Sequence, residues 1–123
     1  MTRGAWREMS MTIATLVFLA SCGDGDPGPS SGLARDKHVQ ELSSTELAML
    51  CDWSAAKFGG YGHRTSCSNG NWLMAAMNRM VCTTGATSSI CDPTVAQTED
   101  CVNAYSANPC GGLPAACVDL IGC

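Results

Sequence analysis

Apolar side chains recur three and four positions apart between Leu47 and Phe58, the spacing of one face of an α-helix. Just upstream, Ser43 and Glu46 have the pattern of a capping box, in which each side chain bonds the backbone N–H of the other residue. Two glycines, at positions 59 and 60, then interrupt the pattern. The sequence therefore predicts a first helix between Ser43 and these glycines.

The next stretch is less regular. Residues 61–71 carry turn signals, of which the pair Asn69 and Gly70 is the strongest, and they predict a loop. A short hairpin near Cys67 and Gly70 is the alternative. Residues 72–82 contain two alanines and no proline, so they predict a second helix that ends within residues 83–85.

Two more helices complete the pattern. Thr94 and Gln97 have the same capping-box pattern and predict the start of a third helix, which ends at the Asn108-Pro109 pair. Pro114 fits the first turn of a last short helix that closes at Gly122. The predicted fold is mainly all-α, a small domain of about four short helices.

The first 21 residues look like a targeting signal. Arg3 and Arg7 precede a run of ten mostly apolar residues, 11–20, which is too short to span a bilayer. The run ends in Leu-Ala-Ser-Cys, with the cysteine at position 22, and this ending resembles the lipobox of bacterial lipoproteins. The resemblance implies that residues 1–21 are removed and that Cys22 receives the lipid.

This signal sets the expected organisation and location. Residues 22–41 begin with a Gly-, Pro- and Ser-rich stretch and are expected to be the lipidated cysteine followed by a disordered tether, with the globular domain at 42–123. The mature chain has a net charge of −5, which argues against nucleic-acid binding. We expect a lipid anchor in the bacterial cell envelope, in the outer rather than the inner membrane, with the domain in the periplasm or at the cell surface.

Eight cysteines remain after Cys22. Their even number and the exported context predict four disulfides, although the spacing leaves the pairing open. A small domain buries too little apolar surface to be stable alone, so the bridges would decide its stability. Zinc is disfavoured because no cysteine pair has the usual two-to-four-residue spacing. These cysteines are Cys51, Cys67, Cys82, Cys91, Cys101, Cys110, Cys117 and Cys123.

Several short motifs are spread over the cysteine-rich part of the chain: LCDW (50–53), FGGYG (58–62), TV (94–95), EDCVN (99–103), NPC (108–110) and PAAC (114–117). Together they resemble small cysteine-rich lipoproteins of unassigned function that are numerous in myxobacteria. The similarity covers most of residues 47–123 and implies no known activity. One stretch departs from these proteins, because the segment after Cys67 is often Thr- and Val-rich in them and reads Trp-Leu-Met-Ala-Ala here.

Catalytic chemistry has little support. His63 would have to act with Ser66 or Asp52, and sequence spacing cannot show that the three meet. A histidine that decorates a glycine-rich turn is the simpler interpretation, so we expect no enzyme, no catalytic residue and no cofactor.

Three hypotheses for function remain. The first is a noncatalytic binding or structural module that recognises another protein or a polymer of the envelope. The second is an inhibitor- or toxin-like module with residues 60–64 as the blocking loop. The third is Cu(I) handling by Met74, Met77 and Met80, which a helix over 72–82 would align in a stripe of soft thioethers; packing of these methionines in the core is the simpler alternative.

Overall fold

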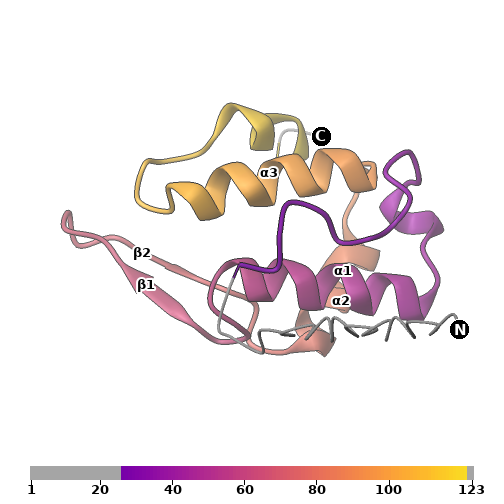
Figure 1. Ribbon diagram of the computed structural model, residues 1–123, viewed down its shortest axis with the longest axis horizontal. Coiled ribbons are helices and arrows are strands. Elements are labelled where there is room, and N and C mark those ends of the chain that lie inside the picture. Colours follow the sequence, from indigo (N-terminus) through magenta and orange to yellow (C-terminus); the bar gives the residue numbers. More distant parts are fainter. Residues whose placement is uncertain (1–25, 122–123) are drawn as a thin grey trace, which may run out of the picture.

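The computed structural model describes residues 26–121, so the expected signal peptide, Cys22 and Cys123 lie outside the described part. Its elements follow the order η1 (Val39–Glu41), α1 (Ser44–Lys57), β1 (Arg64–Ser66), β2 (Trp72–Met74), α2 (Arg79–Ser88), α3 (Val95–Ala107) and η2 (Ala115–Leu120). The fold is mainly α, as predicted, with a hairpin that projects beyond the helices (Figure 1). None of the helices within residues 26–121 is long and apolar enough to cross a bilayer.

The two helices with capping boxes form as predicted. In α1, the Ser43 hydroxyl accepts from the Glu46 N–H while the Glu46 carboxylate accepts from the Ser43 N–H at 2.8 Å. Thr94 and Gln97 do the same at the start of α3. Both signals are local in sequence, so distant contacts do not override them.

The predicted second helix is wrong at both ends. Residues 72–74 are strand β2, which pairs antiparallel with β1, and the helix begins only at Arg79, after the Asn78 side chain accepts from the Val81 N–H. The hairpin alternative near Cys67 is therefore the correct one, and Gly70, with φ of +85°, closes its turn. The helix also continues through residues 83–85 to Ser88.

The last short helix is a 3-10 helix. It covers Ala115–Leu120, and Pro114 lies just before it at the cap position, outside the first turn. The short helix lies where the sequence predicts it, but it is a 3-10 helix and not an α-helix.

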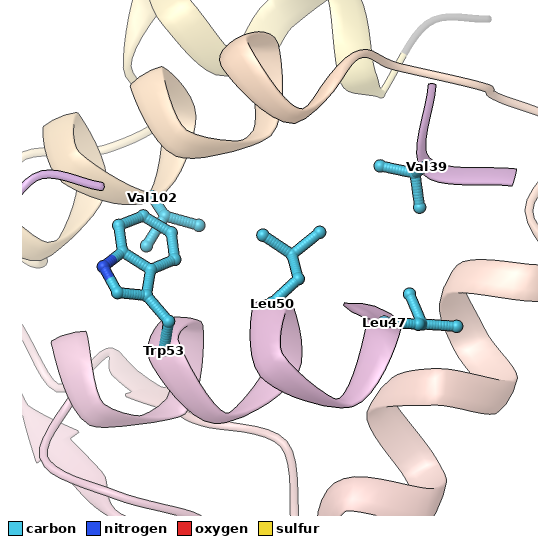
Figure 2. Packing of buried hydrophobic residues seen from close by; sticks show 5 residues of the cluster. All are labelled: Val39, Leu47, Leu50, Trp53 and Val102. Carbon is cyan, nitrogen blue, oxygen red and sulfur yellow. The ribbon is translucent and has the colours of Figure 1, made fainter. Parts of the chain in front are cut away.

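The hydrophobic core is small and lies between α1 and α3. Leu47, Leu50 and Trp53 line one side of α1 and pack with Val102 of α3 and Val39 of η1 (Figure 2). The hairpin contributes little to this cluster, and α2 contributes no buried residue. Burial alone therefore leaves the hairpin and α2 weakly attached.

Disulfides provide those missing attachments. Cys51 of α1 bonds Cys82 of α2, Cys67 at the hairpin turn bonds Cys110 after α3, and Cys101 of α3 bonds Cys117 of η2. Cys51 and Cys101 lie within helices, and each bridges to another element. Cys91 is also disulfide-bonded.

The expected disordered tether is wrong for most of its length. The segment 28–41, which we call the strap, runs along α1 and α3 and places Val39 in the core (Figure 1). Its backbone bonds the start of α3, through Val95 N–H to Lys37 O at 2.8 Å and Val39 N–H to Pro93 O at 2.9 Å. The ordered domain thus begins well before residue 42.

Candidate interaction surface

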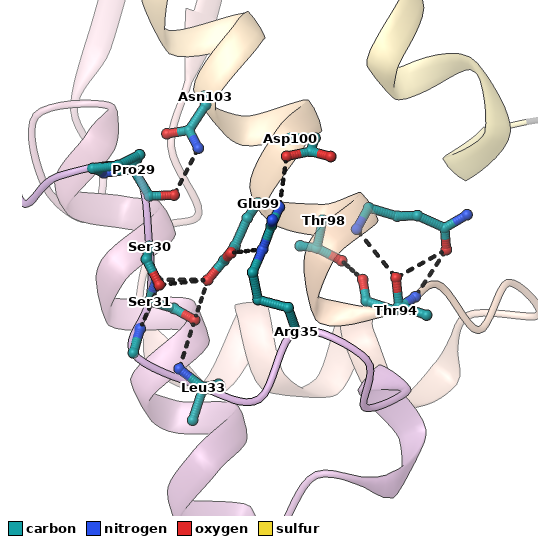
Figure 3. Close-up of polar contacts among 12 residues, drawn as sticks. Pro29, Ser30, Ser31, Leu33, Arg35, Thr94, Thr98, Glu99, Asp100 and Asn103 are labelled. Carbon is teal, nitrogen blue, oxygen red and sulfur yellow. Dashed lines mark hydrogen bonds and ion pairs between the residues drawn. The ribbon is translucent and has the colours of Figure 1, made fainter.

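The strap is held by one buried carboxylate. Glu99 of α3 is only 1% exposed, and one of its oxygens accepts from the Ser31 N–H and from the Ser31 hydroxyl, both at 2.7 Å (Figure 3). The other oxygen accepts from Arg35 Nε at 3.0 Å. A buried charge is stable only when it is paired and hydrogen-bonded, and the strap supplies both conditions.

The same contacts set the protonation of Glu99. Burial by itself would raise the pKa of this carboxyl, but the donors of Ser31 and the Arg35 guanidinium stabilise the ionised form more strongly, so the pKa lies below its usual value. Glu99 is therefore a charged structural clamp, and sequence reasoning did not identify it.

These bonds bring the start of the strap to the C-terminal end of α1. The Trp53 indole N–H donates to the Gly28 carbonyl at 3.1 Å, and Lys57 Nζ lies 2.7 Å from Asp26. Asn103 of α3 donates to the Pro29 carbonyl at 2.8 Å. The described chain thus starts beside the last turn of α1.

The hairpin leaves the molecule from that same end. Gly60 N–H bonds Ala55 O at 2.8 Å, and Gly62 N–H bonds Ala76 O at 2.9 Å, which fixes both ends of the hairpin beside α1. The Tyr61 hydroxyl donates to Asp52 at 2.7 Å. In Figure 1 the hairpin and the first described residues lie at one end of the helices, and the α2–α3 connection lies at the other.

One face of the hairpin is exposed and apolar in part. Alternate residues of the two strands are exposed, and these form what we call the hairpin face: Arg64, Ser66, Trp72 and Met74. Trp72 is 53% exposed, and the Arg64 guanidinium lies 4.5 Å from the centre of a Trp72 ring. The opposite face carries Thr65 and Leu73, which are half-buried.

The Asp52–Arg79 salt bridge, next to the Cys51–Cys82 disulfide, holds α2 against α1 beside the hairpin. Arg79 Nε donates to Asp52 at 2.8 Å and its second nitrogen reaches the other carboxylate oxygen, so α2 is fastened to α1 beside the disulfide. This guanidinium, together with the Tyr61 hydroxyl, lowers the pKa of Asp52. The hairpin face is consequently presented on a fixed base.

The residues considered for catalysis are engaged separately. Asp52 accepts from Tyr61 and Arg79, and Ser66 is exposed on the hairpin face. The ring of His63 packs against Gly59, where an added Cβ would lie 2.7 Å from the ring. Asp52 and His63 therefore make separate contacts, and Ser66 lies on the exposed hairpin face.

The three methionines do not form a helical stripe. Met74 is in β2, Met77 lies between β2 and α2, and Met80 is in the first turn of α2. They are 39%, 58% and 71% exposed, so the alternative that Met77 and Met80 are core residues is also wrong. Within residues 26–121, no group of three or more His, Cys, Asp or Glu side chains is arranged to hold a metal ion.

An apolar cleft of about 240 Å³ lies beside α1 and α2, and residues of η1, α3 and η2 also line it. Leu47 and Leu50 line it from α1, and Gly85 and Ala86 line it from α2, with the Cys51–Cys82 bridge at its wall. The small side chains of α2 that line the cleft, Gly85 and Ala86, leave space beside α1.

Comparison of the chain with protein-family models, with curated proteins and with solved structures finds no match. The similarity to myxobacterial lipoproteins therefore stays an expectation from short motifs, and the surface has to be interpreted from its own residues.

Proposed function

We propose that this protein is an exported, lipid-anchored and noncatalytic module of the bacterial cell envelope that binds another envelope component through the hairpin face. The observation that supports this proposal best is the combination of exposed Trp72 and Met74 with one disulfide in the hairpin turn and another in α2. Disulfides persist in oxidising, exported compartments, which agrees with the lipobox-like ending at Cys22.

The cost of binding is low for such a surface. Cys67–Cys110 fixes the turn and Cys51–Cys82 fixes the following helix, so little conformational entropy is lost when a partner binds. Tryptophan and arginine are also the side chains most enriched at binding hot spots.

The two other hypotheses gain no specific support. The loop at residues 60–64 is a compact turn bonded to α1 and to residue 76, whereas a blocking loop should present an extended segment. The copper hypothesis depended on a helical methionine stripe that does not form.

Anchoring is tested by the mass of the mature N-terminal peptide. We expect a lipid on Cys22, an enlarged precursor when the lipoprotein signal peptidase is inhibited with globomycin, and release of Cys22→Ser from the membrane fraction. An unmodified Cys22 in a correctly processed protein contradicts the proposal.

Binding is tested by photo-cross-linking in cells that produce the full chain. A cross-linking amino acid is placed at Ser66, on the hairpin face, and as a matched exposed control at Ile90 in the α2–α3 connection. Products at position 66 that are absent at position 90 support the proposal, and identical patterns contradict it. A captured enzyme that loses activity on binding would favour the inhibitor hypothesis instead.

A further inference from the structure

The charges of the domain are unevenly distributed along the chain. Residues 53–91 contain three basic residues, Lys57, Arg64 and Arg79, and no aspartate or glutamate. The remaining described segments, 26–52 and 92–121, contain nine carboxylates and only two lysines or arginines. The hairpin and α2 are therefore the basic part of an acidic protein.

Arg64 is the basic residue of this segment whose charge is not paired with a carboxylate among the described residues. Lys57 pairs with Asp26 and Arg79 pairs with Asp52, whereas Arg64 forms no ion pair among the described residues and lies over Trp72. A tryptophan with an adjacent arginine suits a membrane–water interface, where indole rings collect at headgroup level and arginine reaches anionic phosphates.

The strap places this face near the anchor. Asp26 is four positions after Cys22. A chain extends by at most about 3.6 Å per residue, so Asp26 lies within about 14 Å of an anchored Cys22 in any conformation. Asp26 is bonded to the last residue of α1, and the hairpin begins a few residues further along. The end of the molecule that carries the hairpin is thus held at the bilayer.

We infer that the hairpin face contacts the lipid surface in which the protein is anchored, with Trp72 and Met74 at the headgroup level and Arg64 at anionic phosphates. This inference rests on the proposed lipidation of Cys22 and names the partner of the same face. A short tether raises the effective concentration of the lipid surface, so a few interfacial side chains suffice to hold the orientation.

The test uses the full mature, lipidated protein in vesicles of phosphatidylethanolamine and phosphatidylglycerol at three to one, with brominated acyl chains that quench indole fluorescence. The mature chain has two tryptophans, and Trp53 is buried in the core. We expect bromination to lower the wild-type emission by roughly one third to one half, because one of the two indoles lies at the interface. Trp72→Phe should remove nearly all of this quenching.

The control moves the exposed indole to the other end of the helices. Ile90 is 88% exposed, and the double variant Trp72→Phe/Ile90→Trp should show no quenching beyond that of Trp72→Phe. Arg64→Gln should reduce the quenching of Trp72 in these vesicles more than in vesicles of phosphatidylcholine alone. Circular dichroism checks that each variant retains the helical fold.

The outcomes separate the two proposals. A lipidated protein whose Trp72 is not quenched, or is quenched no more than the indole at position 90, overturns the inference and leaves the anchor intact. Protection of Trp72 in native envelopes but not in lipid vesicles overturns it too, in favour of a protein or polymer partner. An unmodified Cys22 overturns both proposals.

Discussion

Two regions of this small domain are stabilised in different ways. In the core region, formed by the strap, α1 and α3, apolar side chains pack together and a buried carboxylate binds a segment 68 residues away in sequence. In the hairpin–α2 region, residues 60–90, Ala75 is the single buried side chain, and attachment depends on disulfides and on the Asp52–Arg79 salt bridge. The region with the poorer packing also exposes more large apolar side chains than the core region does.

The difference shows what the disulfides provide. Because the cross-links hold the hairpin and α2 in place, their side chains are not needed for a core and can face outward. A surface of exposed Trp and Met would otherwise require a larger protein to support it.

Removal of the Cys51–Cys82 bridge should have the largest effect. The bridge closes a loop across 31 positions, so Cys51→Ala/Cys82→Ala should lower the free energy of unfolding by about 3–4 kcal/mol in the chain-entropy model. Urea unfolding without reductant measures the loss. Hydrogen exchange should show that α2 loses protection first, since no residue of α2 is buried.

The matched control removes Cys101 and Cys117, which join α3 to η2 across 16 positions. This double variant should lose about 3 kcal/mol but leave the protection of α2 unchanged. Equal loss of α2 protection in both variants would refute the view that α2 depends on its own bridge.

Glu99→Gln tests the core region. The amide keeps the size of the side chain but removes the charge that Arg35 and Ser31 bind, so we expect a loss of about 2–3 kcal/mol. Urea denaturation gives this value, and exchange of the strap amides should rise more than exchange in α2. Asp100→Asn, which changes an exposed partner of Arg35, is the control and should cost far less.

Acid should weaken the same contact. The pKa of Glu99 is lower in the folded protein than in the unfolded chain, so its contribution is fully present above about pH 4.3 and is lost as the pH falls through the lower folded value. The stability difference between wild type and Glu99→Gln should therefore narrow below about pH 4.3. A difference that stays constant between pH 6 and pH 3 would contradict this role of the charge.

Gly85→Ala should produce the smallest change, and in the opposite direction. A Cβ at Gly85 meets no atom within 4 Å, and the residue is in the interior of α2, where alanine is favoured over glycine by up to about 1 kcal/mol. Thermal unfolding should show a small rise in stability. A loss would mean that the cleft beside α2 needs the space that glycine leaves.

The sequence predicted the features that depend on neighbouring residues. The caps of α1 and α3 involve side chains three positions apart, so Ser43 and Thr94 could be identified without knowledge of the fold. The helix assigned to residues 72–82 failed because its alanines favour a helix locally while pairing with residues 64–66 favours a strand. The misplaced methionine stripe was a consequence of that error.

The candidate surface was harder to find for the same reason. Trp72 and Arg64 become neighbours only when the hairpin pairs, so no helical or linear pattern joins them. The strap has the composition of a flexible linker, and only its hydrogen bonds to Glu99 order it. The composition of a segment shows how much apolar surface it can bury. It does not show that a distant carboxylate, here Glu99, accepts hydrogen bonds from that segment.

The strap also has a consequence for the order of events during secretion. In a chain whose Cys22 stays at the membrane while the following residues are exported in order, the strap emerges before Glu99 of α3. Before α3 is exported, an unfolded segment of the length of residues 22–41 has a root-mean-square end-to-end distance of roughly 22–27 Å. Binding of Ser31 and Arg35 to Glu99 then fixes the strap on α3. With the proposed lipid on Cys22, docking of the strap would therefore bring the domain closer to the membrane.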